Sequence, residues 1–311
     1  MFGDYTRSTP NKIIFTPASD YVLEARNTSG IVTSNYSATR QWGTKPKGGI
    51  YDPYAANLVL AIPGGAVAGI TSTFDVTGQI KFETPTSTYV NAGIVTYSNS
   101  LGIGTYQNKT TTVSGNVSIS STIAKYYSRS IYTAGSNVND YLSISSIGDI
   151  TANTDFCVEM WVYVTGTWSG GGTGYPYLFG SNNNPWGGGG GLGMDWGYSA
   201  STTIPDTNTG SITWRNMSLG TITMGDFKNK WNHLALTRSG GSVCRFFYNG
   251  VQIGQATQTG SLLLGTDFRL GTVPEGGTPH NMQAYFNDFR VTNGSAKYTS
   301  NFTPPNQIYL T

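Results

Sequence analysis

The sequence has little charge. Charged residues make up 11% of its 311 residues, less than half of the roughly 25% typical of a soluble protein. Its 18 Lys and Arg nearly balance its 16 Asp and Glu, so it lacks the strong field that would hold nucleic acid or an anionic membrane. We expect no nucleic-acid partner.

Histidine, cysteine and glutamate are also scarce, which leaves few groups for acid–base catalysis or metal binding. The two cysteines, Cys157 and Cys244, are far apart and have no CxxC spacing, which excludes a zinc knuckle. Each lies in an apolar, strand-like run. We expect two buried free thiols, because buried cysteine usually packs as a small hydrophobic residue; a disulfide between them stays open.

Long apolar runs are missing. No stretch of 18 apolar residues occurs, so we expect no membrane span. The first residues, MFGDYTRSTPNKIIF, have no apolar core after basic residues, so no signal peptide is recognisable and we expect synthesis in a cytoplasm.

Glycine, aromatic and small polar residues are abundant: there are 41 Gly, and aromatics make up 13%. This mixture is typical of turns and strands and excludes an all-α protein. The expected strands are short β-branched or aromatic runs separated by turn signals, as in an antiparallel sandwich or barrel. They cover residues 58–62, 110–120, 130–133, 141–145, 156–164, 231–238, 243–248, 251–256, 268–270 and 285–292.

Two of these strands show which side chains share a face. In 156–164, Phe156 and Val158 alternate with Cys157 and Glu159, and both faces are largely apolar, as in a central strand covered on each side. Strand 231–238 places Leu234 and its even-numbered neighbours opposite the face of His233. Between 243–248 and 251–256 stands Asn-Gly, a strong signal for a two-residue hairpin turn.

Residues 1–50 differ from the rest of the chain. They hold six basic and three acidic residues and end in the linker-like KPKGG. One interpretation is an arm that docks onto a partner chain, and the other is a pair of edge strands or a frayed terminus. The docking interpretation selects apolar and basic side chains as the anchor: Ile13, Ile14, Phe15, Arg26, Arg40 and Trp42.

Several strands together resemble one family. Residues 141–144 (YLSI), 155–162 (DFCVEMWV), 231–238 (WNHLALTR), 247–254 (FYNGVQIG) and 285–305 occur in the order found in laminin-G-like domains of the concanavalin A lectin/glucanase superfamily. The C-terminal end resembles such modules in virion proteins of tailed bacteriophages, and so do the upstream motifs at residues 52–54, 58–63, 73–76, 109–113 and 124–127. The resemblance covers residues 51–311, leaves 1–50 outside, and is interrupted by an insertion at about 83–107 that could form an extra edge hairpin.

The resemblance implies an all-β jelly-roll sandwich of two curved antiparallel sheets. Glucanases of this fold place two carboxylates on one concave face, and retaining cleavage needs them about 5 Å apart. Here the matching strands offer Glu159 alone. His233 has no carboxylate partner in the sequence pattern and is interpreted as structural, and His280 as an exposed loop residue. We expect no enzyme.

Gly-rich loops at 167–177 and 181–193 display large aromatic residues beside asparagines. Such rings suit a sugar or a protein partner, and they could instead fold over the sandwich edge. The candidate binding residues are Trp168, Tyr175, Asn182, Asn183 and Trp186. The GxGxxG formed by Gly188, Gly190 and Gly193 lacks the following helix that a dinucleotide site requires.

Many laminin-G-like domains bind calcium at a rim, so the resemblance leaves room for a calcium ion. The available oxygen donors are Asn139, Asp140, Asp149 and Asp195. They have no EF-hand spacing, and Asn and Asp are also ordinary turn residues. We therefore name no metal ligand and no obligatory cofactor.

The sequence thus predicts a non-enzymatic structural protein of a bacteriophage virion, as a capsid decoration or a tail or fibre component, assembled in the host cytoplasm and released by lysis. Its partners would be other virion proteins, and a homo-oligomer is expected because virion parts sit on symmetric platforms. The alternative is an adhesin that recognises host surface polysaccharide, and the weaker alternative is a polysaccharide depolymerase.

Overall fold

In the computed structural model, the chain forms two compact units, Met1–Gly49 and Ile50–Thr311. The structure describes residues 109–305 with gaps at 126–128, 137–138, 146, 169–175, 182–191, 197–202, 215–216, 266 and 274–279. It also describes residue 54, residues 57–62 and, by their backbone alone, the short strands β1–β5, β7–β10 and β25.

The first unit contains two antiparallel pairs of short strands. Their bounds are β1 Tyr5–Thr9, β2 Lys12–Phe15, β3 Arg26–Asn27 and β4 Gly30–Ile31.

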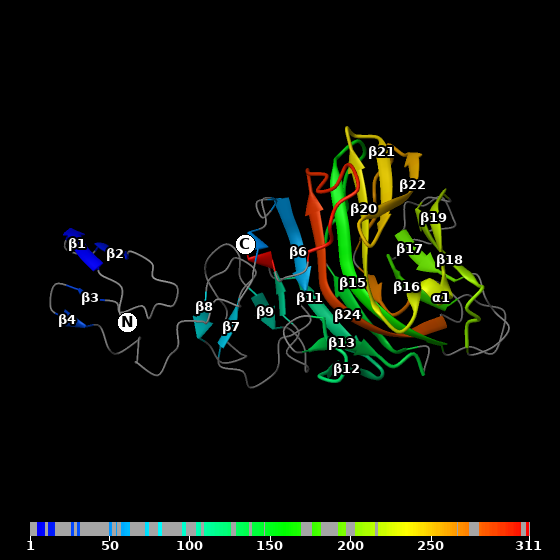
Figure 1. Ribbon diagram of the computed structural model, residues 1–311, viewed down its shortest axis with the longest axis horizontal. Coiled ribbons are helices and arrows are strands. Elements are labelled where there is room, and N and C mark those ends of the chain that lie inside the picture. The colour runs from blue at the N-terminus through cyan, green and yellow to red at the C-terminus, as the bar shows by residue number, and fades with distance from the viewer. Residues whose placement is uncertain are drawn as a thin grey trace. The chain divides into compact units, whose positions relative to one another are not determined.

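The second unit is built on two sheets that pack face to face (Figure 1). Sheet I consists of β6 Leu58–Ile62, β12 Val117–Ser120, β13 Ser130–Thr133, β15 Phe156–Trp168, β20 Trp231–Ser239, β21 Val243–Tyr248, β22 Val251–Thr257 and β24 His280–Asn293. Sheet II consists of β11 Thr110–Ser114, β14 Tyr141–Ser145, β16 Pro176–Gly180, β17 Leu192–Asp195, β18 Thr209–Trp214, β19 Met217–Thr223 and β23 Phe268–Leu270.

Long antiparallel ladders order the strands of sheet I. β15 lies between β24 and β20, followed by β21 and β22, while the other edge of β24 pairs with β13 and with β6. Sheet II runs β11-β14-β23-β16-β17-β18-β19. The first residues of β24 pair parallel with β16, so one strand belongs to both sheets. The all-β sandwich expected from the sequence is confirmed. The parallel pairing of β24 with β16 was not expected; it connects the two sheets, whose other strand pairs are antiparallel.

Short elements complete the second unit. Three pairs of short strands belong to neither sheet, and one of these pairs falls within the predicted insertion at 83–107. One short helix follows β19. Their bounds are β5 Ile50–Tyr51 with β25 Tyr309–Leu310, β7 Ser72–Phe74 with β8 Ile80–Phe82, β9 Val95–Tyr97 with β10 Gly104–Tyr106, and α1 Met224–Phe227.

The core lies between the two sheets and contains the even-numbered face of β15. Phe156 and Val162 are fully buried there, together with Leu234 of β20 and Phe268 of sheet II. The alternation predicted for residues 156–164 is therefore confirmed. The odd-numbered face points away from the core and is covered at one end by the segment that follows β24. That outer face positions the side chains discussed below.

The two cysteines are on different strands and both are buried free thiols, as expected. Burial raises the pKa of the Cys244 thiol to about 11, against the opposing charge of Arg238. Arg238 is itself buried and donates to the backbone oxygens of Thr154, Gly260 and Thr151.

The sequence analysis missed β16, β17, β18 and β19, and in β17 and β19 an internal glycine breaks the hydrophobic pattern. Residues 167–177 and 181–193 were expected to be loops, yet the structure ends β15 at Trp168, begins β16 at Pro176 and begins β17 at Leu192. Tyr177 is buried in β16. His280, expected in a loop, is the first residue of β24 and pairs with Pro176. Residues 110–120 form two strands joined by a turn at Gly115.

Candidate functional site

Most of the binding residues selected from the sequence lie outside the described residues. Tyr175, Asn182, Asn183 and Trp186 are among them, and of Trp168 the structure describes only its place at the end of β15. In the arm, Ile13, Ile14 and Phe15 belong to β2 and Arg26 begins β3, again by backbone alone, while Arg40 and Trp42 lie outside the described residues. Both sets stay predictions.

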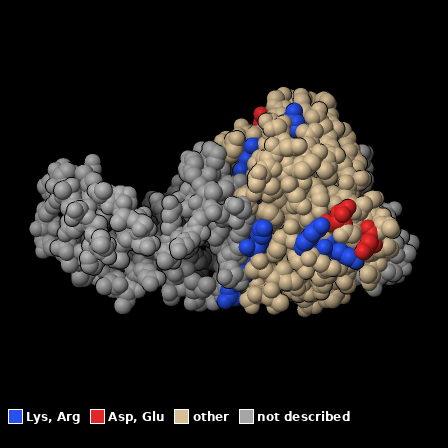
Figure 2. Space-filling model, viewed as in Figure 1, with Lys and Arg blue, Asp and Glu red and all other residues tan. Residues whose placement is uncertain are grey.

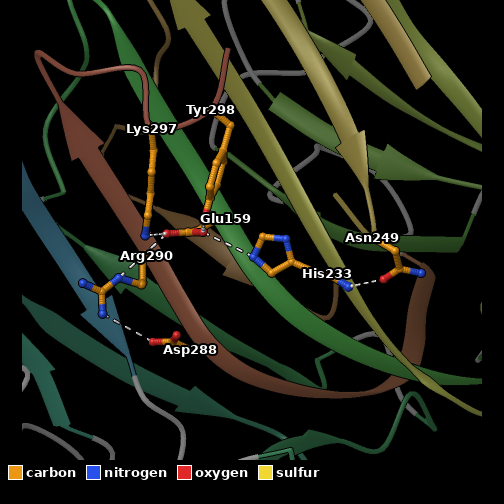
Figure 3. A network of polar contacts seen from close by, with 7 residues as sticks. All are labelled: Glu159, His233, Asn249, Asp288, Arg290, Lys297 and Tyr298. Carbon is orange, nitrogen blue, oxygen red and sulfur yellow. Dashed lines mark hydrogen bonds and ion pairs between the residues drawn. The ribbon is translucent and has the colours of Figure 1, made fainter. Parts of the chain in front are cut away.

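A buried polar network occupies the outer face of sheet I (Figure 3). Its centre is Glu159 of β15, which is 2% exposed. His233 of the neighbouring β20 lies directly opposite Trp161 in the ladder, and its Nε2–H donates to Glu159 Oε2 at 3.2 Å. On the other side, Arg290 of β24 is the register partner of Glu159, with Nε 3.9 Å from Oε1.

The remaining partners of Glu159 come from the C-terminal strap, by which we mean residues 295–305. Lys297 Nζ donates to Glu159 Oε1 at 2.6 Å, and the Tyr298 hydroxyl donates to Oε2 at 2.7 Å. Side chains from β20, β24 and the strap thus meet at the carboxylate of Glu159 on β15. The network fastens the strap to the sheet.

Further contacts hold the strap along β20 and the β21–β22 hairpin. Thr237 Oγ1 donates to the Tyr298 carbonyl oxygen at 2.8 Å, and the Phe302 N–H donates to the Gly250 oxygen at 2.9 Å. The Tyr298 and Phe302 rings stack with centroids 3.6 Å apart, and both lie edge-on to the His233 ring. The outer face of β15 and β20 is therefore covered at this end.

The charges in the network set the ionisation of Glu159. Burial alone would raise its pKa, but Lys297, the hydrogen bond and charge of His233, and Arg290 outweigh burial and hold the pKa of Glu159 well below its ordinary range. Glu159 is therefore a fixed carboxylate with its charge neutralised by its neighbours.

A second buried carboxylate, Asp288, lies on a bulge of β24, where the β15 register shifts. Its backbone φ is +49°, and Arg290 Nη1 is 3.5 Å from its Oδ1. Burial raises the pKa of Asp288, and the nearby Arg290 charge only partly opposes this. Both Glu159 and Asp288 are nearly inaccessible to solvent, so neither presents an oxygen to a saccharide.

One sequence interpretation needs correction here. His233 has a carboxylate partner, Glu159, because the register of β15 and β20 places the two in contact. Sequence reasoning missed this because the partners are far apart in the chain. The available signal was the alternation of the two predicted strands, which put Glu159 on the face of Cys157 and Trp161, and His233 on the face opposite Leu234.

The oxygen donors considered for calcium have other roles where the structure describes them. Asp140 Oδ1 accepts from the Asn116 N–H, and its Oδ2 accepts from the N–H and hydroxyl of Ser136. Asp149 accepts from the Gly265 N–H. The Asn139 carbonyl oxygen accepts from the Tyr141 N–H, and the Asp195 side chain is outside the described part. Among the side chains that the structure describes, no group of three or more His, Cys, Asp or Glu could hold a metal ion.

Beyond the strap, four aromatic side chains cross the outer face of sheet I in one row, which we call the outer aromatic row. In order across the sheet, the row is Tyr132 of β13, Tyr285 of β24, Tyr163 of β15 and Trp231 of β20. The ring centroids of successive members are 4.6, 5.7 and 5.9 Å apart. All four are partly exposed.

Neutral polar groups border the row. Gln283 Nε2 donates to the Tyr132 hydroxyl at 2.8 Å, and the Thr165 hydroxyl donates to Gln283 Oε1 at 2.5 Å. Burial, with the neighbouring phenols of Tyr132 and Tyr163, raises the pKa of Tyr285. Each row residue stood on a predicted strand, but the cross-strand register that aligns them was not readable from the sequence.

The comparisons with known proteins agree with this architecture. The family model described as the concanavalin A-like lectin/glucanases superfamily matches residues 135–297. The match covers more than half of the chain, and the chain belongs to this superfamily. A bacteriophage origin stays a prediction. Comparison with curated protein sequences gives no match.

The solved structures that this chain matches are distant in sequence, and those described here have TM-scores below 0.5. The binding domain of Paraclostridial Mosquitocidal Protein 1 is 15% identical over 79% of this chain and 50% of its own, with a TM-score of 0.46. The botulinum neurotoxin serotype G binding domain is 13% identical over 78% and 49%, with a TM-score of 0.43. Domain 4 of the Geobacillus stearothermophilus arabinanase AbnA, in complex with arabinotriose, is 15% identical over 61% and 84%, with a TM-score of 0.39. The match spans about half the length of the two toxin domains.

The described part of the chain contains no helix with the length and apolar character needed to cross a membrane.

Proposed function

We propose that the protein is a non-enzymatic structural component of a tailed-bacteriophage particle that displays its lectin-like sandwich for binding. The observation that carries the proposal is the state of Glu159, the carboxylate at the position that matches the family motif. It is buried, ionised and engaged by Lys297, Tyr298 and His233. A glycosidase acid must instead reach the glycosidic oxygen of its substrate.

The virion assignment is supported by the sequence resemblance of residues 51–311 to phage modules. In this proposal residues 1–50 attach the sandwich to the capsid or tail, other virion proteins are its partners, and the protein assembles as a homo-oligomer on a symmetric platform. It is made in the host cytoplasm and leaves by lysis.

The attachment role is tested by deleting residues 1–48, a boundary next to that of the first compact unit. The truncated chain should keep the thermal melting transition of the sandwich and be missing from purified particles by quantitative mass spectrometry. A truncated chain that is incorporated at wild-type copy number overturns the anchoring role.

A second candidate is an adhesin that recognises host surface glycans, and the outer aromatic row favours it. Ring faces stack on the apolar faces of sugars, while a few neutral polar groups take the hydroxyls. The Trp168→Ala/Trp186→Ala variant tests the loops selected from the sequence, since binding to a glycan array should fall if those loops form the site.

The depolymerase candidate is separated from both by a reducing-end assay on bacterial surface polysaccharide. We expect no release above the buffer blank from the wild type. The non-enzymatic assignment would be overturned if the wild type released reducing ends and the Glu159→Gln variant, with the melting temperature of the wild type, did not.

A further inference from the structure

We propose that the outer aromatic row is a binding site for a neutral, extended polysaccharide chain that crosses the strands of sheet I. The inference deepens the adhesin candidate and rests on the sandwich being displayed for binding. It does not depend on the loops that the sequence singled out.

The first argument is the way the sheet fixes the rings. Each row residue comes from a different, adjacent strand and is held by its ladder: Tyr132 opposite Tyr285, Tyr285 opposite Tyr163, and Tyr163 opposite Trp231. Rings held in place on a sheet lose little conformational entropy when a ligand binds. At a strand spacing of about 4.8 Å, four strands span roughly 14 Å, which suits several sugar rings rather than one.

The second argument is the orientation of the rings. Tyr132 and Tyr285 are tilted by 33°, whereas Tyr163 stands at 87° to Tyr285 and at 62° to Trp231. The row therefore holds rings in more than one orientation instead of forming one flat platform. A saccharide chain likewise offers both apolar C–H faces and hydroxyl groups.

The third argument is charge. The four row residues, and Gln283 and Thr165, which hydrogen-bond at one end of the row, are uncharged and offer hydroxyl and amide groups. A cation on the same face, Lys125, lies over Trp161 with its Nζ 3.9 Å from the ring centroid, outside the row. Figure 2 shows that most of the described surface that it presents is uncharged, with a group of side chains of both signs at its lower right. A neutral ligand meets no desolvated, unpaired charge in such a row, whereas an acidic polysaccharide would find no cation in it.

The fourth argument separates a glycan from a protein partner. A stable protein interface buries about 800 Å² on each side and has an apolar centre. Among the residues whose side chains the structure describes, Val251 is the one large hydrophobic side chain that is exposed, and it lies on β22, outside the row. The row provides aromatic rings without the apolar surroundings of an interface core.

The test is affinity electrophoresis of the full chain in native gels that contain hydroxyethyl cellulose, galactomannan or dextran, with polygalacturonate as the acidic comparator. We expect retardation by at least one neutral polysaccharide. Tyr163→Ala and Tyr285→Ala should weaken it about tenfold, the effect of removing one aromatic contact. Tyr132→Ala is a third variant, on the strand at the end of the row, in case a central substitution unfolds the protein.

The matched control is Tyr141→Ala, a partly exposed tyrosine of β14 in sheet II that packs under Arg269 with its centroid 4.1 Å from the guanidinium carbon. It should leave the retardation unchanged. Melting temperatures of all variants show that the sandwich is intact.

Each outcome decides something different. No retardation by any of the three neutral polysaccharides, or retardation by polygalacturonate alone, overturns the inference. Retardation that the row variants leave unchanged overturns the row as the site and leaves the adhesin candidate standing. The inference is also overturned if the wild type shows no retardation by polysaccharide but binds a protein partner that Tyr163→Ala and Tyr285→Ala no longer bind. The virion role is read separately, because incorporation of Tyr285→Ala into particles should equal that of the wild type.

Discussion

Lys297 Nζ lies 2.6 Å from Glu159 Oε1, although 138 residues separate the two in the chain. Both side chains are almost completely buried. A buried ion pair of this kind gives little net stability relative to a well-packed apolar pair, but breaking it leaves an uncompensated charge. This ion pair therefore couples the stability of the strap to that of the centre of sheet I, beside the hydrogen bonds of Tyr298 and Phe302.

The first prediction concerns Lys297→Met. The substitution keeps an apolar stem but leaves Glu159 without its nearest cation, so we expect a loss of about 3–5 kcal/mol in the free energy of unfolding. Urea denaturation measures it. The control is Lys228→Met, which breaks a pair with Asp206, whose side chain is 63% exposed, and should cost less than about 1 kcal/mol.

A second variant tests the cause of that loss. In Lys297→Met/Glu159→Gln the unpaired charge is gone, so part of the stability should return. Equal losses in Lys297→Met and Lys228→Met would show that the buried pair contributes no more than a surface pair.

The second prediction is a dependence of stability on pH. The folded-state pKa of Glu159 is below its unfolded-state value of about 4.3. Its contribution is therefore complete above that value and is lost as the pH falls from about 4.3 through the folded-state pKa. Urea midpoints measured from pH 7 to pH 3 should fall more steeply for the wild type than for Glu159→Gln. Parallel profiles would contradict the assignment of Glu159 as the ionised centre.

The third prediction is that neither thiol reacts in the folded protein. Cys157 and Cys244 are 1% and 0% exposed, and burial raises the pKa of Cys244 to about 11, so little nucleophilic thiolate is present at pH 8. A thiol-reactive disulfide dye should detect no thiol in buffer and two in concentrated guanidinium chloride. Rapid reaction in buffer would mean that the strands carrying the thiols, β15 and β21, open readily.

The fourth prediction compares two glycines with positive φ. At Gly250 (φ +81°) an added Cβ would lie 1.9 Å from the Phe302 carbonyl oxygen, whereas at Gly240 (φ +58°) it would meet nothing within 4 Å. Gly240→Ala should cost about 1–2 kcal/mol from backbone conformation alone. Gly250→Ala should cost clearly more, because the strap must also move.

Limited trypsin digestion gives an independent readout of the glycine pair. Displacement of the strap exposes Lys297, so cleavage after it should be faster in Gly250→Ala than in Gly240→Ala. Equal cleavage rates would mean that the strap does not rest on the hairpin turn.

The sequence was sufficient for strands whose pattern is local. The alternation from Phe156 to Val164 and the Asn249-Gly250 turn, with φ values of +50° and +81°, follow from residue types at neighbouring positions. The strands at 192–195 and 217–223 escaped because Gly193 and Gly220 interrupt their pattern. Pairing with neighbouring strands makes them strands: β17 pairs with β16 and β18, and β19 pairs with β18.

The sites depended on register, which local pattern does not determine. The alternation assigned Glu159 and His233 to one face of their strands without saying which face points outward, and their contact depends on how β15 is aligned with β20. The outer aromatic row has the same origin, since Tyr285 and Tyr163 become neighbours only through the ladder of β24.

The double membership of β24 has a consequence for how the molecule comes apart. Its first residues pair with β16 of sheet II, and the rest pairs with β15, β13 and β6 of sheet I. We therefore expect the two sheets to lose their order together, because both contain residues of β24. Amide protons from Phe286 to Val291 should exchange with solvent only when the entire sandwich opens, and both layers should lose protection in one cooperative step.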